Sequence, residues 1–205
     1  MRTVVFDLGQ VVVKWDPYRA QEGFISEEEW EDFLERTDFW TVNHGLDAGK
    51  TIREVREAFA RRFPSDLAIF DRHIENFPRT LTGPVPGVEK IIDDLHAFGV
   101  KTAVLSNWSA ELFKHALTAM PVINRLGMRI VSGEVGLAKP DPAIFRLLLE
   151  RLREPASKVV FIDDNVANIE AAGALGIDAI LFQDATQLRS ELASRCIIPA
   201  TERRS

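Results

Sequence analysis

Short apolar runs that stop abruptly at a polar residue recur along the chain and constrain its fold more than any other feature. The clearest runs are 4–6 before Asp7, 103–105 before Ser106 and 159–162 before Asp163. Runs that are apolar throughout predict short strands buried on both faces, as in a parallel sheet. A further strand is predicted over 179–182.

Stretches with apolar side chains at helical spacing lie between and after these runs. They cover residues 88–98, 142–152, 168–175 and 186–194. A helical period of this kind predicts helices that each bury one face. Strand–helix alternation predicts an α/β fold in which a parallel sheet is covered by helices on both faces.

The stretch 16–81 interrupts the alternation, because it carries several helical patterns and no strand signal. Ser26 with Glu29, and Thr51 with Glu54, have the spacing of a capping box, which marks the start of a helix. We therefore predict a core domain of residues 1–15 and 82–205 and an inserted helical domain of residues 16–81. Residues 83–87 are predicted to be a stiff turn where the chain returns to the sheet, and 199–205 a frayed tail.

Composition narrows the classes of function. The chain has 25 Lys and Arg against 31 Asp and Glu, a net charge of −6, which argues against a nucleic-acid partner. A lone cysteine, Cys196, allows neither an internal disulfide nor a cysteine zinc site and fits a reducing compartment. The chain has no long apolar run, and Asp7 interrupts the first short one, so we expect a cytoplasmic protein without a membrane partner. The sequence leaves the oligomeric state open.

Polar residues follow the predicted strands, and these are the candidate site residues. In an open parallel sheet, ligands bind beyond the carboxyl ends of the strands, so folding would gather these residues at one edge. A lysine after the strand-like 129–131 would join the same edge. The set comprises Asp7, Ser106, Asn107, Lys139, Asp163 and Asp164.

This set of groups favours phosphate chemistry. Clustered carboxylates repel one another unless a cation lies among them, and oxygen ligands suit Mg²⁺. The metal and Lys139 would attract an oxyanion such as a phosphate ester. Asp7 could then act as a covalent nucleophile through an aspartyl-phosphate that water hydrolyses.

Four segments resemble, in order, the motifs of the haloacid dehalogenase-like hydrolase superfamily. They are 6–13 (FDLGQVVV), 104–107 (VLSN), 139–142 (KPDP) and 161–165 (FIDDN). The chain looks most similar to the branch of bacterial sugar-phosphate phosphatases and the phosphatase domain of soluble epoxide hydrolase, in which an Asn–hydrophobic pair, here Asn168-Ile169, follows the Asp pair. The resemblance implies a Rossmann-like core with a helical cap, residues 16–81, that selects the substrate.

The resemblance also implies a role for each candidate residue. Ser106 and Asn107 would hold the phosphoryl group, and Lys139 would neutralise charge on it and on the nucleophile. The remaining residues would hold Mg²⁺: Asp7, which is also the nucleophile, the backbone carbonyl of Gly9, Asp164 as an inner-sphere ligand, and Asp163 through metal-bound water. The order of Asp163 and Asp164 could be reversed.

One position departs from the family pattern. Phosphatases of the superfamily usually carry a second Asp two residues after the nucleophile, as general acid, and this chain has Gly9 there. The similar sugar-phosphatase branch also accepts Gly. We hypothesise that a cap residue or Asp16 supplies the proton, or that the substrates have good leaving groups.

The predicted function is a Mg²⁺-dependent phosphatase of a small phosphorylated metabolite, such as a sugar phosphate. One alternative is a metal-independent carbon–halogen hydrolase, although the Asp163-Asp164 pair would then lack a neutralising cation. The other is a catalytically weak phosphate-binding or regulatory protein. Four aromatic or histidine residues are weaker site candidates, because such residues more often build a core: Trp15, Trp40, His44 and Trp108.

Overall fold

The core of the protein is a five-stranded parallel sheet in the strand order β5-β4-β1-β6-β7. The computed structural model describes residues 2–199, so residues 200–205 of the predicted tail lie outside the described part. The strands are β1 (Thr3–Phe6), β4 (Lys101–Ser106), β5 (Met128–Val131), β6 (Val159–Asp163) and β7 (Asp178–Leu181). Each predicted strand is present, and the α/β prediction is confirmed.

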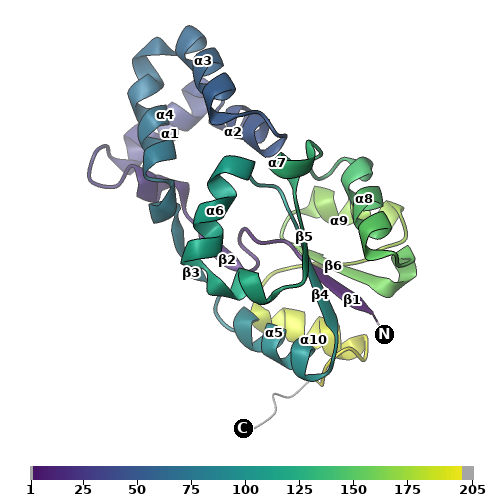
Figure 1. The fold of residues 1–205 in the computed structure, drawn as a ribbon. Helices are drawn as coiled ribbons and strands as arrows, with labels where there is room; N and C mark the ends of the chain where they lie inside the picture. Colours follow the sequence, from purple (N-terminus) through teal and green to yellow (C-terminus); the bar gives the residue numbers. More distant parts are fainter. Residues whose placement is uncertain (1, 200–205) are drawn as a thin grey trace.

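Helices cover both faces of this sheet (Figure 1). Alternate residues of β1 face opposite sides: Val4 and Phe6 lie in one hydrophobic cluster and Val5 in the other. The first cluster includes side chains of α5 (Val88–Ala97), α6 (Ala110–Ala119) and α10 (Ala185–Ser194). The second includes side chains of α8 (Pro142–Leu152) and α9 (Val166–Ala174). The fully apolar strands therefore have a packing partner on each side, as their sequence predicts.

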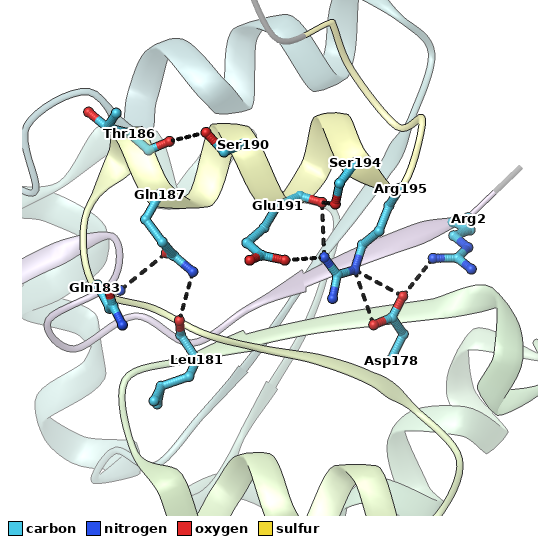
Figure 2. Close-up of polar contacts among 10 residues, drawn as sticks. All are labelled: Arg2, Asp178, Leu181, Gln183, Thr186, Gln187, Ser190, Glu191, Ser194 and Arg195. Carbon is cyan, nitrogen blue, oxygen red and sulfur yellow. Dashed lines mark hydrogen bonds and ion pairs between the residues drawn. The ribbon is translucent and has the colours of Figure 1, made fainter.

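Polar contacts fix the last helix to the edge strand (Figure 2). Asp178 in β7 accepts from Arg195 Nε, at 3.1 Å to each oxygen, and from Arg2 Nη1 at 2.7 Å. Gln187 Nε2 donates to the carbonyl oxygen of Leu181 at 3.1 Å. These contacts join α10, β7 and the residue before β1.

The stretch between β2 (Val13–Trp15) and β3 (Leu81–Pro84) contains helices joined by short turns, and no strand. Both capping boxes form, Ser26 with Glu29 and Thr51 with Glu54. The two strands pair antiparallel in a separate two-stranded ribbon. The ribbon was not predicted: β3 occupies part of the expected 83–87 turn. The helical elements are η1 (Pro17–Ala20), α1 (Glu27–Thr37), α2 (Phe39–Asp47), α3 (Ile52–Arg62), η2 (Pro64–Asp66), α4 (Leu67–Glu75) and η3 (Phe77–Thr80).

This helical insertion has its own aromatic core, which includes Trp30, Phe33, Phe39, Phe59 and Phe70. In Figure 1 it stands beyond the carboxyl ends of the sheet strands, next to α6 and the short helix α7 (Ser132–Val135). None of the described helices is long and apolar enough to cross a membrane.

The insertion docks closely on the core. Gly49, with φ of 97°, follows α2 and lies so near the end of α7 that an added Cβ would be 3.3 Å from the Cα of Gly136. The backbone N–H of Ile52 donates to Glu111 Oε1 of α6 at 2.7 Å. The end of α2 is therefore held over the carboxyl edge of the sheet.

Candidate active site

The register of the central strand gathers the candidate residues. Phe6 of β1 is level with Val104 of β4 and with Ile162 of β6. The residue directly after β1 is Asp7, whose backbone N–H donates to the Ile162 carbonyl at 2.9 Å. The ends of β1, β4 and β6 therefore place their polar side chains at one edge, as the sequence predicts.

Lys139 lies between two of these carboxylates. Its Nζ is 2.9 Å from Asp7 Oδ1 and 2.6 Å from Asp163 Oδ2, and only 1% of its side chain is exposed. Asn107 holds the backbone of this lysine: its Nδ2 donates to the Lys139 carbonyl, and its Oδ1 accepts from the Lys139 N–H, both at 2.8 Å. The side chain of Asn107 thus positions Lys139, a contact that the sequence did not indicate.

Asp163 and Asp164 differ in their surroundings although they are adjacent. Asp163 is fully buried and, besides Lys139, accepts from the Asn165 N–H at 2.8 Å and from Asn168 Nδ2 at 3.0 and 3.1 Å. Asp164 is exposed. Its carboxylate is the more accessible of the two to an incoming ligand.

Three carboxylates here could hold a metal ion. One oxygen from each of Asp7, Asp163 and Asp164 lies within 4.8 Å of the others. All three donors are hard oxygens, which fits Mg²⁺. The single positive charge of Lys139 offsets only part of the negative charge of three carboxylates, so the charge of the site also fits a cation.

Burial shapes the ionisation of this cluster. It raises the pKa of the Asp7 carboxyl to about 6, although the Lys139 ammonium opposes that change. Burial also disfavours the charge on Lys139, but the carboxylates of Asp7 and Asp163 outweigh it, and the pKa of Lys139 lies above its ordinary value. Lys139 is therefore a permanent cation beside the candidate nucleophile.

A cavity of about 80 Å³ lies between the helical insertion and this edge of the sheet. Asp47, the last residue of α2, reaches it from the insertion, and sequence reasoning missed this residue because no strand-end pattern marks it. Asn43 Nδ2 donates to Asp47 Oδ2 at 3.3 Å. The lining residues are Gly9, Trp15, Asn43, Asp47, Phe77, Asn107, Trp108, Ser109 and Leu112.

The weaker candidates fall into two groups. Trp15 and Trp108 line the cavity, and the indole N–H of each is buried without a hydrogen-bond partner among the described residues. Trp40 is 49% exposed and meets Trp15 edge-on, and His44 is exposed. Trp108, which is buried, and Trp15, which is partly buried, therefore lie where a substrate could contact them.

Asp16 does not lie at the cavity. Its carboxylate caps η1 by accepting from the Tyr18 N–H at 3.1 Å, and it pairs with Arg19 at 3.2 Å. It is absent from the residues that line the cavity. Of the two proton sources suggested by the sequence, this geometry disfavours Asp16 and favours another residue of the insertion.

Two curated relatives are similar to this chain over most of its length. The drimenol cyclase of Aspergillus calidoustus is 40% identical over 207 residues, which cover 95% of this chain and 36% of the cyclase. This chain therefore spans about a third of the length of that relative. The phosphoglycolate phosphatase of Aquifex aeolicus is 25% identical over 183 residues, which cover 88% of this chain and 84% of the phosphatase.

Comparison with solved structures and with family models agrees with the fold. A HAD-family enzyme from Bacteroides thetaiotaomicron, solved in complex with magnesium and inorganic phosphate, matches with a TM-score of 0.71 at 22% identity, over 90% of this chain and 95% of that chain. A family model described as haloacid dehalogenase-like hydrolase matches residues 1–176. Since that match takes in every strand except β7, the chain belongs to the haloacid dehalogenase-like hydrolases.

Proposed function

We propose that this hydrolase is a Mg²⁺-dependent phosphatase of a small phosphorylated metabolite, such as a sugar phosphate. The observation that carries the proposal is the Lys139 ammonium bound to Asp7 and Asp163, with Asp164 beside them. This arrangement suits the transfer of a phosphoryl group, because it combines a nucleophile, a fixed cation and a carboxylate cluster that could hold a metal ion. The phosphate complex of the structural neighbour and the phosphatase relative support the same class of substrate.

In the proposed mechanism, a carboxylate oxygen of Asp7 attacks phosphorus and forms an aspartyl-phosphate. Ser106 and the backbone at Asn107 bind phosphoryl oxygens, and Lys139 offsets negative charge on Asp7 and on the transferring group. Water then hydrolyses the aspartyl-phosphate and releases inorganic phosphate.

Mg²⁺ would be held by Asp7, the backbone carbonyl of Gly9 and Asp164, with Asp163 behind them. When bound, it supplies positive charge opposite the phosphoryl oxygens. The contacts of Asp163 with Lys139 and Asn168 support this order of the two acids, because they occupy its oxygens.

We also propose that the helical insertion, residues 16–81, is a cap over a core of residues 1–15 and 82–205. Its separate aromatic core and its position over the carboxyl edge of the sheet support this division. As a cap it would exclude water from the reaction and select the substrate through the cavity.

Phosphate release from an aryl phosphate and from a panel of sugar phosphates, with and without Mg²⁺, tests the proposal. We expect Mg²⁺-dependent turnover that Asp7→Asn abolishes. Asp32→Asn, which changes a carboxylate on the surface of α1, is the matched control and should keep the wild-type rate. Halide release from a haloacid without any phosphate release would favour the carbon–halogen hydrolase. Tight phosphate binding without turnover would favour a regulatory protein.

A further inference from the structure

The proposed mechanism lacks a proton donor for the leaving oxygen. The family position for that donor is Gly9, which has no side chain, and Gly9 lines the cavity from the core. Asp47 lines the same cavity from the insertion. A leaving group in this cavity would therefore have Gly9, which offers no acid, on the core side and the Asp47 carboxyl group on the insertion side.

Resting on the proposed phosphatase activity, we propose that Asp47 is its general acid and donates the proton to the leaving oxygen. Asp47 is the one ionisable side chain among the described residues that line the cavity. Lys139 binds both Asp7 and Asp163, and Asp16 is occupied as a helix cap.

The surroundings of Asp47 suit a proton donor. Burial, and then the charge of Asp7, raise its pKa to about 7, against the opposing effects of Lys139 and of a hydrogen bond from the backbone of Ser109. A carboxyl group with a pKa near neutrality is protonated often enough to donate and returns readily to that state. Asp7 and Lys139 are the charged groups that act on it.

The position of Asp47 is set by the docking of the insertion. Two residues further on, Gly49 lies against the backbone of Gly133 and Gly136. Within α2, Asn43 holds one of the Asp47 carboxyl oxygens. The same short segment therefore both contacts the core and carries the acid.

The two half-reactions balance. In the first, the Asp7 oxygen bonds to phosphorus, the bond from phosphorus to the leaving oxygen breaks, and the Asp47 proton moves to that oxygen to give the free alcohol. In the second, water attacks phosphorus, the bond from phosphorus to Asp7 breaks, and inorganic phosphate leaves with both protons of that water. Asp47 then takes up a proton from the solvent, which restores the acid.

The leaving group decides how much an acid matters. p-Nitrophenyl phosphate releases a stable phenolate, whereas glycerol phosphate and sugar phosphates release a basic alkoxide. Removing a general acid should slow the alkyl esters by about 10²–10⁴-fold and leave the aryl ester little changed.

The experiment compares wild type, Asp47→Asn and the control Asp16→Asn on p-nitrophenyl phosphate and on the alkyl phosphate that wild type hydrolyses best. We expect Asp47→Asn to lose only alkyl turnover and Asp16→Asn to lose neither. Retained turnover of the aryl ester would show that the Asp47→Asn variant is folded and that Asp7 still acts as the nucleophile.

Either an equal loss on both esters or no loss on either overturns the role of Asp47 and leaves the phosphatase standing. A wild-type protein that hydrolyses no phosphate ester overturns the proposed function, and the inference with it.

Discussion

The positive charge of Lys139 is important for the stability of the fold, because it neutralises buried carboxylates. Its ammonium pairs with Asp7 and Asp163, and Asp163 is completely buried. A buried carboxylate without its partner must either remain charged in a poorly solvated place or take up a proton. Both options lower the stability of the fold.

We expect Lys139→Met to lower the free energy of unfolding by about 3–5 kcal/mol, measured by urea denaturation with EDTA present. Lys101→Met is the control, because Lys101 is 73% exposed and its ion pair with Glu154 is worth about 1 kcal/mol or less. If both substitutions lowered the free energy of unfolding equally, the buried ion pairs of Lys139 would contribute no more to stability than the exposed pair of Lys101.

The space around residue 9 does not require a glycine. An added Cβ would meet no atom within 4 Å, and the backbone there is outside the left-handed region. A side chain can therefore be introduced at the position where phosphatases of the family usually carry their acid.

We expect Gly9→Asp to fold and, in the Asp47→Asn background, to raise alkyl phosphate turnover by about 10²-fold or more. Gly9→Asn fills the same space without a proton to donate and should give no such gain. Steady-state rates on glycerol phosphate measure the difference, and equal rates for the two variants would rule out a restored acid.

At the scale of elements, α4 contains a histidine with unusual surroundings. His73 is buried among the rings of Trp30, Phe39 and Phe77, and neither ring nitrogen has a partner among the described residues. Burial lowers the pKa of His73 from 6.5 to about 4. The folded insertion thus requires the neutral imidazole.

This histidine should make stability depend on pH. Between about pH 6.5 and pH 4 the unfolded chain binds a proton that the folded chain does not, so stability falls as the pH drops through that window. The full loss is about 3 kcal/mol. His73→Phe should remove this contribution in urea titrations at a series of pH values, and His44→Gln, at an exposed histidine, should not. A pH profile unchanged by His73→Phe would contradict the assignment.

The elements differ in how far the sequence predicts them. The runs at 4–6 and 159–162 predict strands because every side chain must be buried, and Thr51 with Glu54 predicts a helix start from local hydrogen bonds. The ribbon of β2 and β3 has neither signal, since Lys14 and Thr82 are exposed and Gly83 carries no side chain. Its pairing depends on residues far apart in the chain.

The same distinction applies to the site. The meeting of Asp7 and Asp163 could be predicted, because each stands where a buried run ends and the carboxyl ends of parallel strands share one edge of the sheet. The approach of Asp47 to the cavity depends on how two separately packed parts dock, and no periodicity in α2 encodes that docking. The partnership of Asn107 with Lys139 is likewise a tertiary contact.

For the whole molecule, metal binding should stabilise the fold. A ligand that binds only the native state adds about 2.7 kcal/mol at one hundred times its dissociation constant. We expect Mg²⁺ to raise the melting temperature of the wild type and not that of Asp164→Ala, with EDTA reversing the rise. Asp184→Asn, at the cap of α10, is the control and should respond as wild type does. A shift that persists in Asp164→Ala would place the ion elsewhere.

The chain leaves the core at Trp15 and returns at Leu81, and these two residues are paired across the ribbon. The two ends of the insertion are therefore neighbours. The pairing of the five-stranded sheet does not depend on the number of residues between them. Because the junction lies in the ribbon, a shorter or longer segment can join there without shifting the register of the five-stranded sheet. Replacing this one contiguous segment would change the residues that the insertion contributes to the cavity, Asn43 and Asp47 among them, and would leave the strands of the sheet intact.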